Sequence, residues 1–226
     1  MANADVRKKI IQERREREKN QRIQSIIESA KKLFFSKGYL KTTMDEIALG
    51  AEISKPTIYQ YFKTKDDLFF SLMIPVIEDI GRELEKLERA LSKGKIKDGA
   101  DMISRIFAAL YHCYETLPET FRIVQLFQQQ GLVAELNPET RSMLNEKGRR
   151  NFDLCRRIVS MGIEKGMIAK VNVWELADLI WGTTVGVIQL EDIKQDDKRG
   201  NRFKRSTLKL AEDTIINYLT REAGAE

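Results

Sequence analysis

The stretch from residue 43 to residue 68 constrains the fold most, because it specifies two short helices joined by a tight turn. Thr43 and Glu46 have the spacing of a capping box, in which each side chain satisfies a free backbone N–H group at a helix start. Apolar residues at helical spacing follow, Gly50 and Ala51 close the helix, and residues 52–53 make the turn. Ser54 is a favourable N-cap for the second helix. Two helices in this arrangement can present the second one to a partner.

The second helix of this pair has one apolar face and one polar face. Ile58 and Phe62 lie four positions apart, so both point to the same side of a helix. The other side carries a polar and aromatic set: Lys55, Pro56, Thr57, Gln60 and Tyr61, with Tyr59 at the edge. Glutamine pairs with adenine, threonine and proline contact the thymine methyl, and lysine and tyrosine reach phosphates. The pattern predicts a helix that enters the major groove of DNA, and the alternative is a solvated helical corner.

Two lysines follow this helix, at Lys63 and Lys65. Lys65 opens the next helix, where free backbone N–H groups and the helix dipole also attract phosphate. We therefore include both lysines among the predicted DNA contacts.

The net positive charge lies on the same part of the chain. Residues 1–67 contain 15 Lys+Arg and 10 Asp+Glu, whereas residues 68–226 contain 24 of each. A charge excess confined to one segment is typical of a nucleic-acid-binding surface. Residues 1–20 form a basic N-terminal extension, which is either a helical continuation of the first helix or a disordered arm. Such an arm can enter the minor groove or sit on phosphates, and the alternative is simple disorder without a DNA contact.

Residues 22–73 resemble the DNA-binding domain of the tetracycline-repressor (TetR) family. The run Ile-Ser-Lys-Pro-Thr-Ile-Tyr-Gln-Tyr-Phe-Lys-Thr-Lys-Asp-Asp-Leu at 53–68 looks like the family signature, and residues 26–39 and 42–48 resemble its first two helices. The resemblance implies a homodimer that reads an inverted-repeat operator in double-stranded DNA. The family's contact positions match Thr43, Lys55, Pro56, Thr57, Tyr59, Gln60, Tyr61 and Lys65. Many members carry a small residue in place of Pro56, and Gln60 lies at a variable position, so the operator sequence stays open.

The whole chain predicts an all-α fold of about nine helices, with no strand pattern of useful length. We expect the basic extension at 1–20, a three-helix DNA-binding domain at 21–65 and a helical ligand-binding and dimerisation domain at 66–226. A long helix over 65–91 contains Pro75, which should kink it, either as a static bend or as a coupling element. Further helices are expected at 97–117, 118–131, 138–165, 173–193 and 203–219.

The second domain is rich in adaptable apolar and aromatic side chains, most of which must be core. The resemblance implies a small-molecule pocket among these helices, and a hydrophobic or amphipathic inducer is expected because tyrosine and glutamine would orient an otherwise apolar ligand. The candidate lining residues are Met73, Phe107, Tyr111, Tyr114, Phe121, Gln125 and Trp181.

Residues 173–190 are strongly apolar and carry few charges. Gly182 and Gly186 stand four apart and allow close backbone approach, so this helix either fills a core or packs on a second subunit. The resemblance implies a four-helix dimer interface made with the final helix. Two-fold symmetry would then place the two reading helices about 34–36 Å apart. The expected interface residues are Gly182, Gly186, Leu190, Leu208 and Ile215.

Catalytic chemistry has little support in this sequence. His112 is the only histidine, and Cys113 and Cys155 are the only cysteines, so the usual metal-ligand spacings are absent. There is no glycine-rich phosphate loop and no nucleophile elbow. We expect no enzyme, no metal and no cofactor; His112 is read as a packed residue and the cysteines as buried thiols, with a redox switch as the alternative.

No apolar run approaches the roughly 20 residues of a membrane span, and no signal peptide is evident, so a cytoplasmic protein is expected. We predict a ligand-responsive transcriptional regulator, and specifically a repressor that an inducer releases from DNA. The alternative is a helical ligand-binding or scaffold protein whose basic segment binds another anionic partner.

Overall fold

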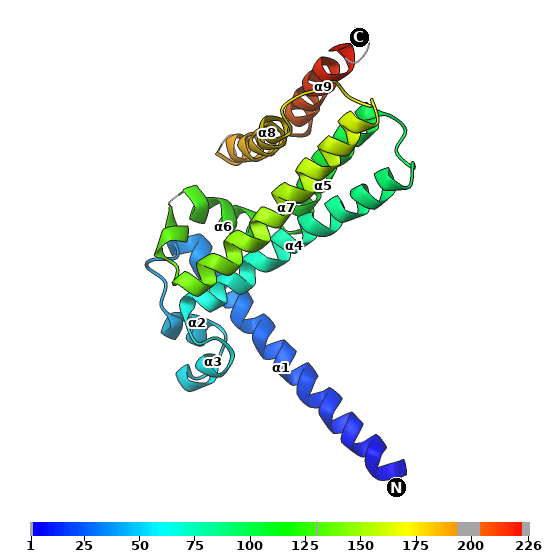
Figure 1. The fold of residues 1–226 in the computed structure, drawn as a ribbon. Helices are drawn as coiled ribbons and strands as arrows, with labels where there is room; N and C mark the ends of the chain where they lie inside the picture. The colour runs from blue at the N-terminus through cyan, green and yellow to red at the C-terminus, as the bar shows by residue number, and fades with distance from the viewer. Residues whose placement is uncertain (1, 130, 194–203, 223–226) are drawn as a thin grey trace. The chain divides into compact units, whose positions relative to one another are not determined.

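The computed structural model describes residues 2–129, 131–193 and 204–222, and over these ranges it contains nine α-helices, one 3-10 helix and no strand (Figure 1). The all-α fold class predicted from sequence is therefore confirmed. The helices are α1 (Ala2–Lys37), α2 (Met44–Gly50), α3 (Lys55–Tyr61), α4 (Lys65–Ser92), α5 (Gly99–Thr116), α6 (Pro118–Gln129), η1 (Leu132–Glu135), α7 (Pro138–Glu164), α8 (Val173–Ile193) and α9 (Lys204–Glu222). Most bounds agree with the predicted ones within two residues, and Phe203, the predicted start of the last helix, lies outside the described residues.

The chain divides into two compact units. The first contains residues 1–76 and 119–144, and the second contains residues 77–118 and 145–226. The sequence reading placed the division between residues 65 and 66, at the start of α4. The contacts divide the chain at three points: inside α4 after residue 76, at the start of α6 after residue 118, and inside α7 after residue 144. The passages in α4 and α7 lie within continuous helices.

The first unit has a small core at the junction of α1, α2, α3 and the start of α4. Ile26, Ile47 and Ile58 are fully buried, one from each of the first three helices. Phe69 of α4 is also fully buried, and its ring lies 5.2 Å from that of Tyr39. Edge-to-face packing at this separation stabilises aromatic pairs beyond their buried area.

The N-terminal extension is a helix in this structure. It forms the first part of α1, which is one continuous helix of 36 residues and extends well beyond α2 and α3 (Figure 1). Of the two possibilities that the sequence left open for residues 1–20, the structure has the helical continuation.

The second unit is a helical bundle in which α9 packs on α5 and α8, and α5 packs on α8. Gly99 begins α5 against the chain that follows α7, where an added Cβ would lie 2.1 Å from the Met167 carbonyl oxygen. This close backbone approach requires glycine at position 99. Nearby in the chain, the Ala169 amide donates to the Leu219 carbonyl at 3.0 Å, which fixes the end of α9.

Pro75 lies inside α4 and is exposed. A proline has no N–H group, so the Ser71 carbonyl loses its usual intrahelical partner at this point. The helix continues to Ser92, and the kink expected at Pro75 stays a prediction.

Cys113 and Cys155 are buried thiols. Burial raises the pKa of each thiol to about 12, which keeps both protonated near neutral pH. None of the helices described is long and apolar enough to cross a membrane.

Candidate nucleic-acid interface

Helix α2 is closed at both ends by specific hydrogen bonds. At its start the Glu46 amide donates to Thr43 Oγ1 at 3.3 Å, and the Thr43 amide donates to Glu46 Oε2 at 2.9 Å, so the predicted capping box is present. At its end the Ile53 amide donates to the Ala48 carbonyl at 3.0 Å, and the Glu52 amide donates to the Leu49 carbonyl at 3.1 Å. This pair of bonds is a Schellman motif, which stops a helix and reverses the chain.

The Schellman motif requires a left-handed residue directly after the cap, and this chain uses Glu52, with φ of 56°. Glycine is the usual residue there, because a side chain in the left-handed region costs roughly 1–2 kcal/mol. Ile53, which follows, is half-buried and anchors the turn against the core. The direction in which α3 leaves the turn is therefore set by a strained residue.

Helix α3 presents the two faces that its sequence predicts. Ile58 is fully buried and Phe62 is 8 % exposed, so both point into the first unit's core. Lys55, Pro56 and Gln60 are exposed. Tyr59 is 42 % exposed, whereas Thr57 and Tyr61 are half-buried. Beside α3, Thr43 and Lys63 are also exposed.

The start of α3 is held differently from the start of α2. Ser54 occupies the N-cap, but its hydroxyl lies 2.7 Å from Thr57 Oγ1 and makes no bond to a backbone amide. Lys55 Nζ donates to Asp45 Oδ2 at 2.9 Å across the turn. Both groups of this ion pair are more than half exposed, so it is available to exchange for a phosphate contact.

Two serines of α1 fix α2 in place. Ser25 Oγ donates to the Ala51 carbonyl at 3.2 Å, and Ser29 Oγ donates to the Ile47 carbonyl at 2.9 Å. The Ser25 bond satisfies the Ala51 carbonyl at the end of α2. The Ile47 carbonyl accepts from Ser29 in addition to the Ala51 amide, which donates to it at 2.9 Å. Gly50 makes the close approach possible, because a Cβ there would lie 2.4 Å from Ser29 Oγ.

Lys65 has a partner that the sequence reading did not foresee. Its ammonium donates to the carbonyl oxygens of Tyr39 at 2.8 Å and Thr42 at 3.0 Å, and it lies 4.3 Å from the centre of the Tyr39 ring. Burial lowers the pKa of Lys65. The ammonium thus closes the loop between α1 and α2, where it donates to these carbonyl oxygens, and its predicted phosphate contact stays a prediction.

The start of α4 carries a second capping box, which was also missed. The Asp67 amide donates to Thr64 Oγ1 at 3.0 Å, and the Thr64 amide donates to Asp67 Oδ2 at 3.1 Å. Next to it, Asp66 accepts from the Asn137 amide at 2.8 Å and from the Tyr39 hydroxyl. Burial and this hydrogen bond to Asp66 raise the pKa of Tyr39. The spacing Thr64-x-x-Asp67 was a readable signal for the cap, whereas nothing local signalled the contacts of Asp66.

The seven candidate ligand residues do not form one described cluster. Met73, Phe121 and Gln125 belong to the first unit, and the other four belong to the second. Within the second unit, the rings of Tyr111 and Tyr114 are 5.8 Å apart. Five of the seven candidates are buried: Met73, Phe107, Tyr114, Phe121 and Gln125. The other two, Tyr111 and Trp181, are half-buried.

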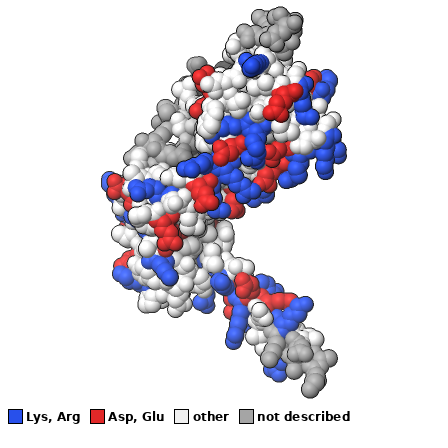
Figure 2. Space-filling view, in the orientation of Figure 1, with Lys and Arg blue, Asp and Glu red and all other residues white. Residues whose placement is uncertain are grey.

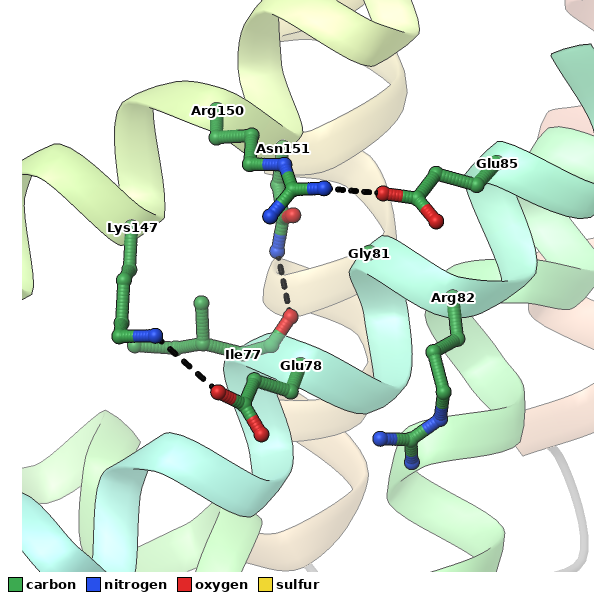
Figure 3. Close-up of a pocket in the computed structure, with 8 residues that line it drawn as sticks. All are labelled: Ile77, Glu78, Gly81, Arg82, Glu85, Lys147, Arg150 and Asn151. Atoms are coloured by element: carbon green, nitrogen blue, oxygen red, sulfur yellow. Dashed lines mark hydrogen bonds and ion pairs between the residues drawn. The ribbon is translucent and has the colours of Figure 1, made fainter.

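Among the described residues of the second unit, clefts open on both sides of the bundle's long helices α4 and α5. One, of about 240 Å³, lies between α5 and α9 and includes Phe107 and Tyr111 in its lining. The other, of about 300 Å³, lies between α4 and α7 and is polar (Figure 3). There Lys147 bonds Glu78 and Arg150 bonds Glu85, so its cations are held by carboxylates.

The α8 candidates for a dimer contact lie on an open face. Gly182 and Gly186 are exposed, and a Cβ added to either would have no neighbour within 4 Å. Leu190 is 48 % exposed and Leu179, three residues before Gly182, is 53 % exposed. At this spacing the four residues form an apolar stripe along α8.

The α9 candidates are not exposed. Leu208 and Ile215 are each 8 % exposed, and α9 packs on α5 and α8 of the same chain, so these two side chains belong to its own core. Leu210 and Tyr218 are 68 % and 55 % exposed on the remaining face. Leu210 and Tyr218 are thus the more exposed apolar pair of α9, and the contact of Leu208 and Ile215 with a second subunit stays a prediction.

Within the described part of the chain, no group of three His, Cys, Asp or Glu side chains could hold a metal ion. His112 is exposed to 45 % and its Nε2 lies 3.9 Å from Asp79 Oδ2. The packed histidine that we expected is therefore a half-exposed residue on the surface of α5.

Comparisons with known proteins agree with this geometry. The family model for bacterial regulatory proteins of the tetR family matches residues 26–72. The chain is 35 % identical over 144 residues to the uncharacterized HTH-type transcriptional regulator YhgD of Bacillus subtilis, covering 63 % of this chain and 70 % of that protein. It is 26 % identical over 184 residues to the fatty acid metabolism regulator protein of the same organism, covering 80 % and 90 %.

The fold also matches solved structures. One is AibR in complex with isovaleryl coenzyme A and operator DNA, with a TM-score of 0.64 and 18 % identity over 88 % of this chain and 97 % of that one. At this identity the likeness shows the fold alone. It nevertheless extends over the second unit, which the family model does not reach.

Proposed function

Because this chain belongs to the TetR family of bacterial regulatory proteins, and is thus a DNA-binding transcriptional regulator, we propose that it is a homodimeric repressor released from an inverted-repeat operator by an acyl-coenzyme A thioester. The observation that carries the DNA part of this proposal is the polar face of α3, with Gln60 and Lys55 exposed over a buried Ile58. The proposed contacts are Thr43, Lys55, Pro56, Thr57, Tyr59, Gln60, Tyr61 and Lys63.

The roles within this set follow from side-chain chemistry. Gln60 is the candidate for direct base reading, because its amide can pair with both polar groups of adenine in the major groove. Lys55 and Lys63 are the candidates for phosphate, since both ammonium groups are exposed. Phosphate contacts fix the position of the protein on the duplex, and base contacts select the sequence.

A homodimer is supported by apolar surface that this chain leaves uncovered. Leu179 and Leu190 of α8 flank two exposed glycines, and Leu210 and Tyr218 of α9 are more than half exposed. Two-fold pairing of these helices would bury both stripes and would present two copies of α3 to successive major grooves.

The effector class rests on two relatives. One regulates fatty acid metabolism, and the protein of similar fold was solved with isovaleryl coenzyme A. An acyl-coenzyme A is amphipathic, with an apolar chain and anionic phosphates, which agrees with the amphipathic inducer expected from sequence. Release requires the ligand to prefer the conformer that does not fit the operator; a shift from 1:99 to 99:1 needs about a 10⁴-fold preference.

The test is selection of bound sequences from random duplex DNA, followed by titration of the selected duplex with acyl-coenzyme A of short and long chain. The expected result is an inverted repeat whose two halves are about one helical turn apart, and release by one chain-length class but not by coenzyme A alone. Enrichment of no inverted repeat would contradict the DNA part. An operator complex that ignores every acyl-coenzyme A would contradict the effector part only.

A further inference from the structure

Residues 2–22 form a charged part of α1 that the reading helix does not require. From Val6 to Gln21 every side chain described is exposed, and Lys and Arg are frequent along this stretch (Figure 2). A helix without a buried face gains nothing from packing and is marginal in water by itself. We therefore expect the exposed side chains of this part of α1 to contact a partner molecule.

The helical spacing shows which side of the extension faces the DNA-binding helices. Arg15, Lys19, Arg22, Ile26 and Ser29 follow one another at intervals of four, three, four and three residues, so they lie on one face of α1. Ile26 is fully buried and Ser29 bonds the end of α2. The face that packs on α2 thus continues beyond the core as a basic stripe, which we define as Arg15, Lys19 and Arg22.

The stripe is available to a partner. Its three side chains are exposed, and among the residues described none of them is paired with a carboxylate. Elsewhere on the extension, Arg14 bonds Glu18 at 2.8 Å and Arg17 bonds the Glu13 carbonyl at 3.4 Å. Three unpaired cations in a row are complementary to a chain of phosphates.

We infer that the basic stripe of α1 is a second DNA-contacting surface, which binds backbone phosphates beside the groove read by α3. This inference rests on the proposed function and adds a contact region to it. At 1.5 Å per residue the stripe lies about 6 to 16 Å beyond Ile26 along α1, within the span of a few base pairs. Its contacts carry no sequence information, so they raise affinity for all operators equally.

The test compares two triple variants that remove the same number of charges from opposite sides of α1. The stripe variant is Arg15→Gln/Lys19→Gln/Arg22→Gln, and the control is Lys9→Gln/Arg14→Gln/Arg17→Gln. All six side chains are exposed, so neither variant should disturb the core. Binding to the selected operator duplex is measured between 50 and 200 mM salt, and the oligomeric state of each protein by sedimentation.

Each phosphate contact adds about 0.9 to the slope of log affinity against log salt. In the proposed homodimer, three contacts in each protomer are six contacts with the operator, so their loss makes the slope shallower by about 5.4. Between 50 and 200 mM salt the affinity of the stripe variant should therefore fall about 2,000-fold less than the affinity of the wild type. The control should retain the wild-type slope to within about one contact. Equal slopes for the two variants would overturn the inference, and so would a stripe variant that fails to dimerise, since that would make the stripe a protein contact.

Failure of this inference is distinguishable from failure of the proposed function. If the stripe variant keeps the wild-type slope while the wild type still selects an inverted repeat, only the second surface is lost. If the wild type selects no inverted repeat, the proposed function itself is contradicted.

Discussion

Replacement of Lys65 by methionine should destabilise the fold of the first unit instead of removing one DNA contact. Methionine keeps much of the length of the lysine stem but supplies no donor for the carbonyl oxygens of Tyr39 and Thr42, which the ammonium reaches at 2.8 and 3.0 Å. It also removes a cation 4.3 Å from the Tyr39 ring. The loop between α1 and α2 would then lack its closing contact.

The magnitude follows from these contacts. Hydrogen bonds to a charged group contribute about 1.5–3 kcal/mol each, and a cation–π contact adds about 0.5–1 kcal/mol. Burial lowers the pKa of Lys65, so desolvation offsets part of this gain, and the side chain is only half-buried. We expect a net loss of about 2–4 kcal/mol in the free energy of unfolding.

The assay is urea unfolding followed by circular dichroism, with Lys63→Met as the matched control. Lys63 is exposed, so its replacement should change stability by less than about 0.5 kcal/mol. In DNA binding the two variants should differ in the opposite sense. Only Lys63→Met should make the salt slope shallower, by about 1.8 for the two copies of Lys63 in the proposed homodimer. A Lys65→Met protein of wild-type stability with a shallower slope would refute the reasoning and restore Lys65 as a phosphate ligand.

Three further predictions concern the reading helix, its support and the dimer. Gln60→Ala should cost about 1–3 kcal/mol of binding free energy per half-site of the selected operator and relax preference at one base pair in each, whereas an equal loss on all sequences would exclude base reading. The hydrogen bond from Lys37 holds the pKa of Glu46 at about 2, below its usual 4.5. The ionised Glu46 carboxylate therefore stabilises the fold above about pH 4.5, and this stabilisation is lost as the pH falls toward 2. Glu46→Gln should therefore be less stable than the wild type at pH 6 and converge with it in acid, as pH-dependent thermal unfolding would reveal. Leu210→Glu should weaken the dimer in sedimentation without unfolding the chain, whereas Leu208→Ala should cost about 2–5 kcal/mol of stability; the reverse pattern would mean that α9 is turned the other way.

Local signals in the sequence were sufficient for α2 and α3. The capping box at Thr43 and the four-residue spacing of Ile58 and Phe62 involve residues close together in the chain. The helices that these residues specify can therefore be predicted from the sequence alone. The same holds for Asn172, whose side chain accepts from the Trp174 amide at 3.0 Å as an N-cap of α8. All these features connect residues at most four positions apart.

Contacts between residues far apart in the chain could not be predicted from these local signals. The acceptors of Lys65 are 23 and 26 residues away in an irregular loop, and no periodic pattern marks a carbonyl oxygen as an acceptor. On α9, apolar side chains occur on two faces, and sequence cannot say which face the rest of the chain covers. Leu208 and Leu210 differ by only two positions, yet their exposed fractions are 8 % and 68 %.

The position of the division between the units has a related explanation. The sequence places the domain boundary near Lys65, in a helix that the two domains share, and that boundary stays a prediction. Here α4 and α7 each run through the division without a break, and a continuous helical pattern gives no sign of where its contacts change partner.

The left-handed backbone of Glu52 limits how this protein could be re-targeted by helix grafting. A foreign recognition sequence inserted after Ile53 would inherit the existing turn and hence the aim of α3. A graft that starts earlier would replace the residue that fixes that aim, and a β-branched side chain at position 52 would favour a different exit angle. Specificity redesign on this scaffold is thus confined to the eight positions from Ser54 to Tyr61.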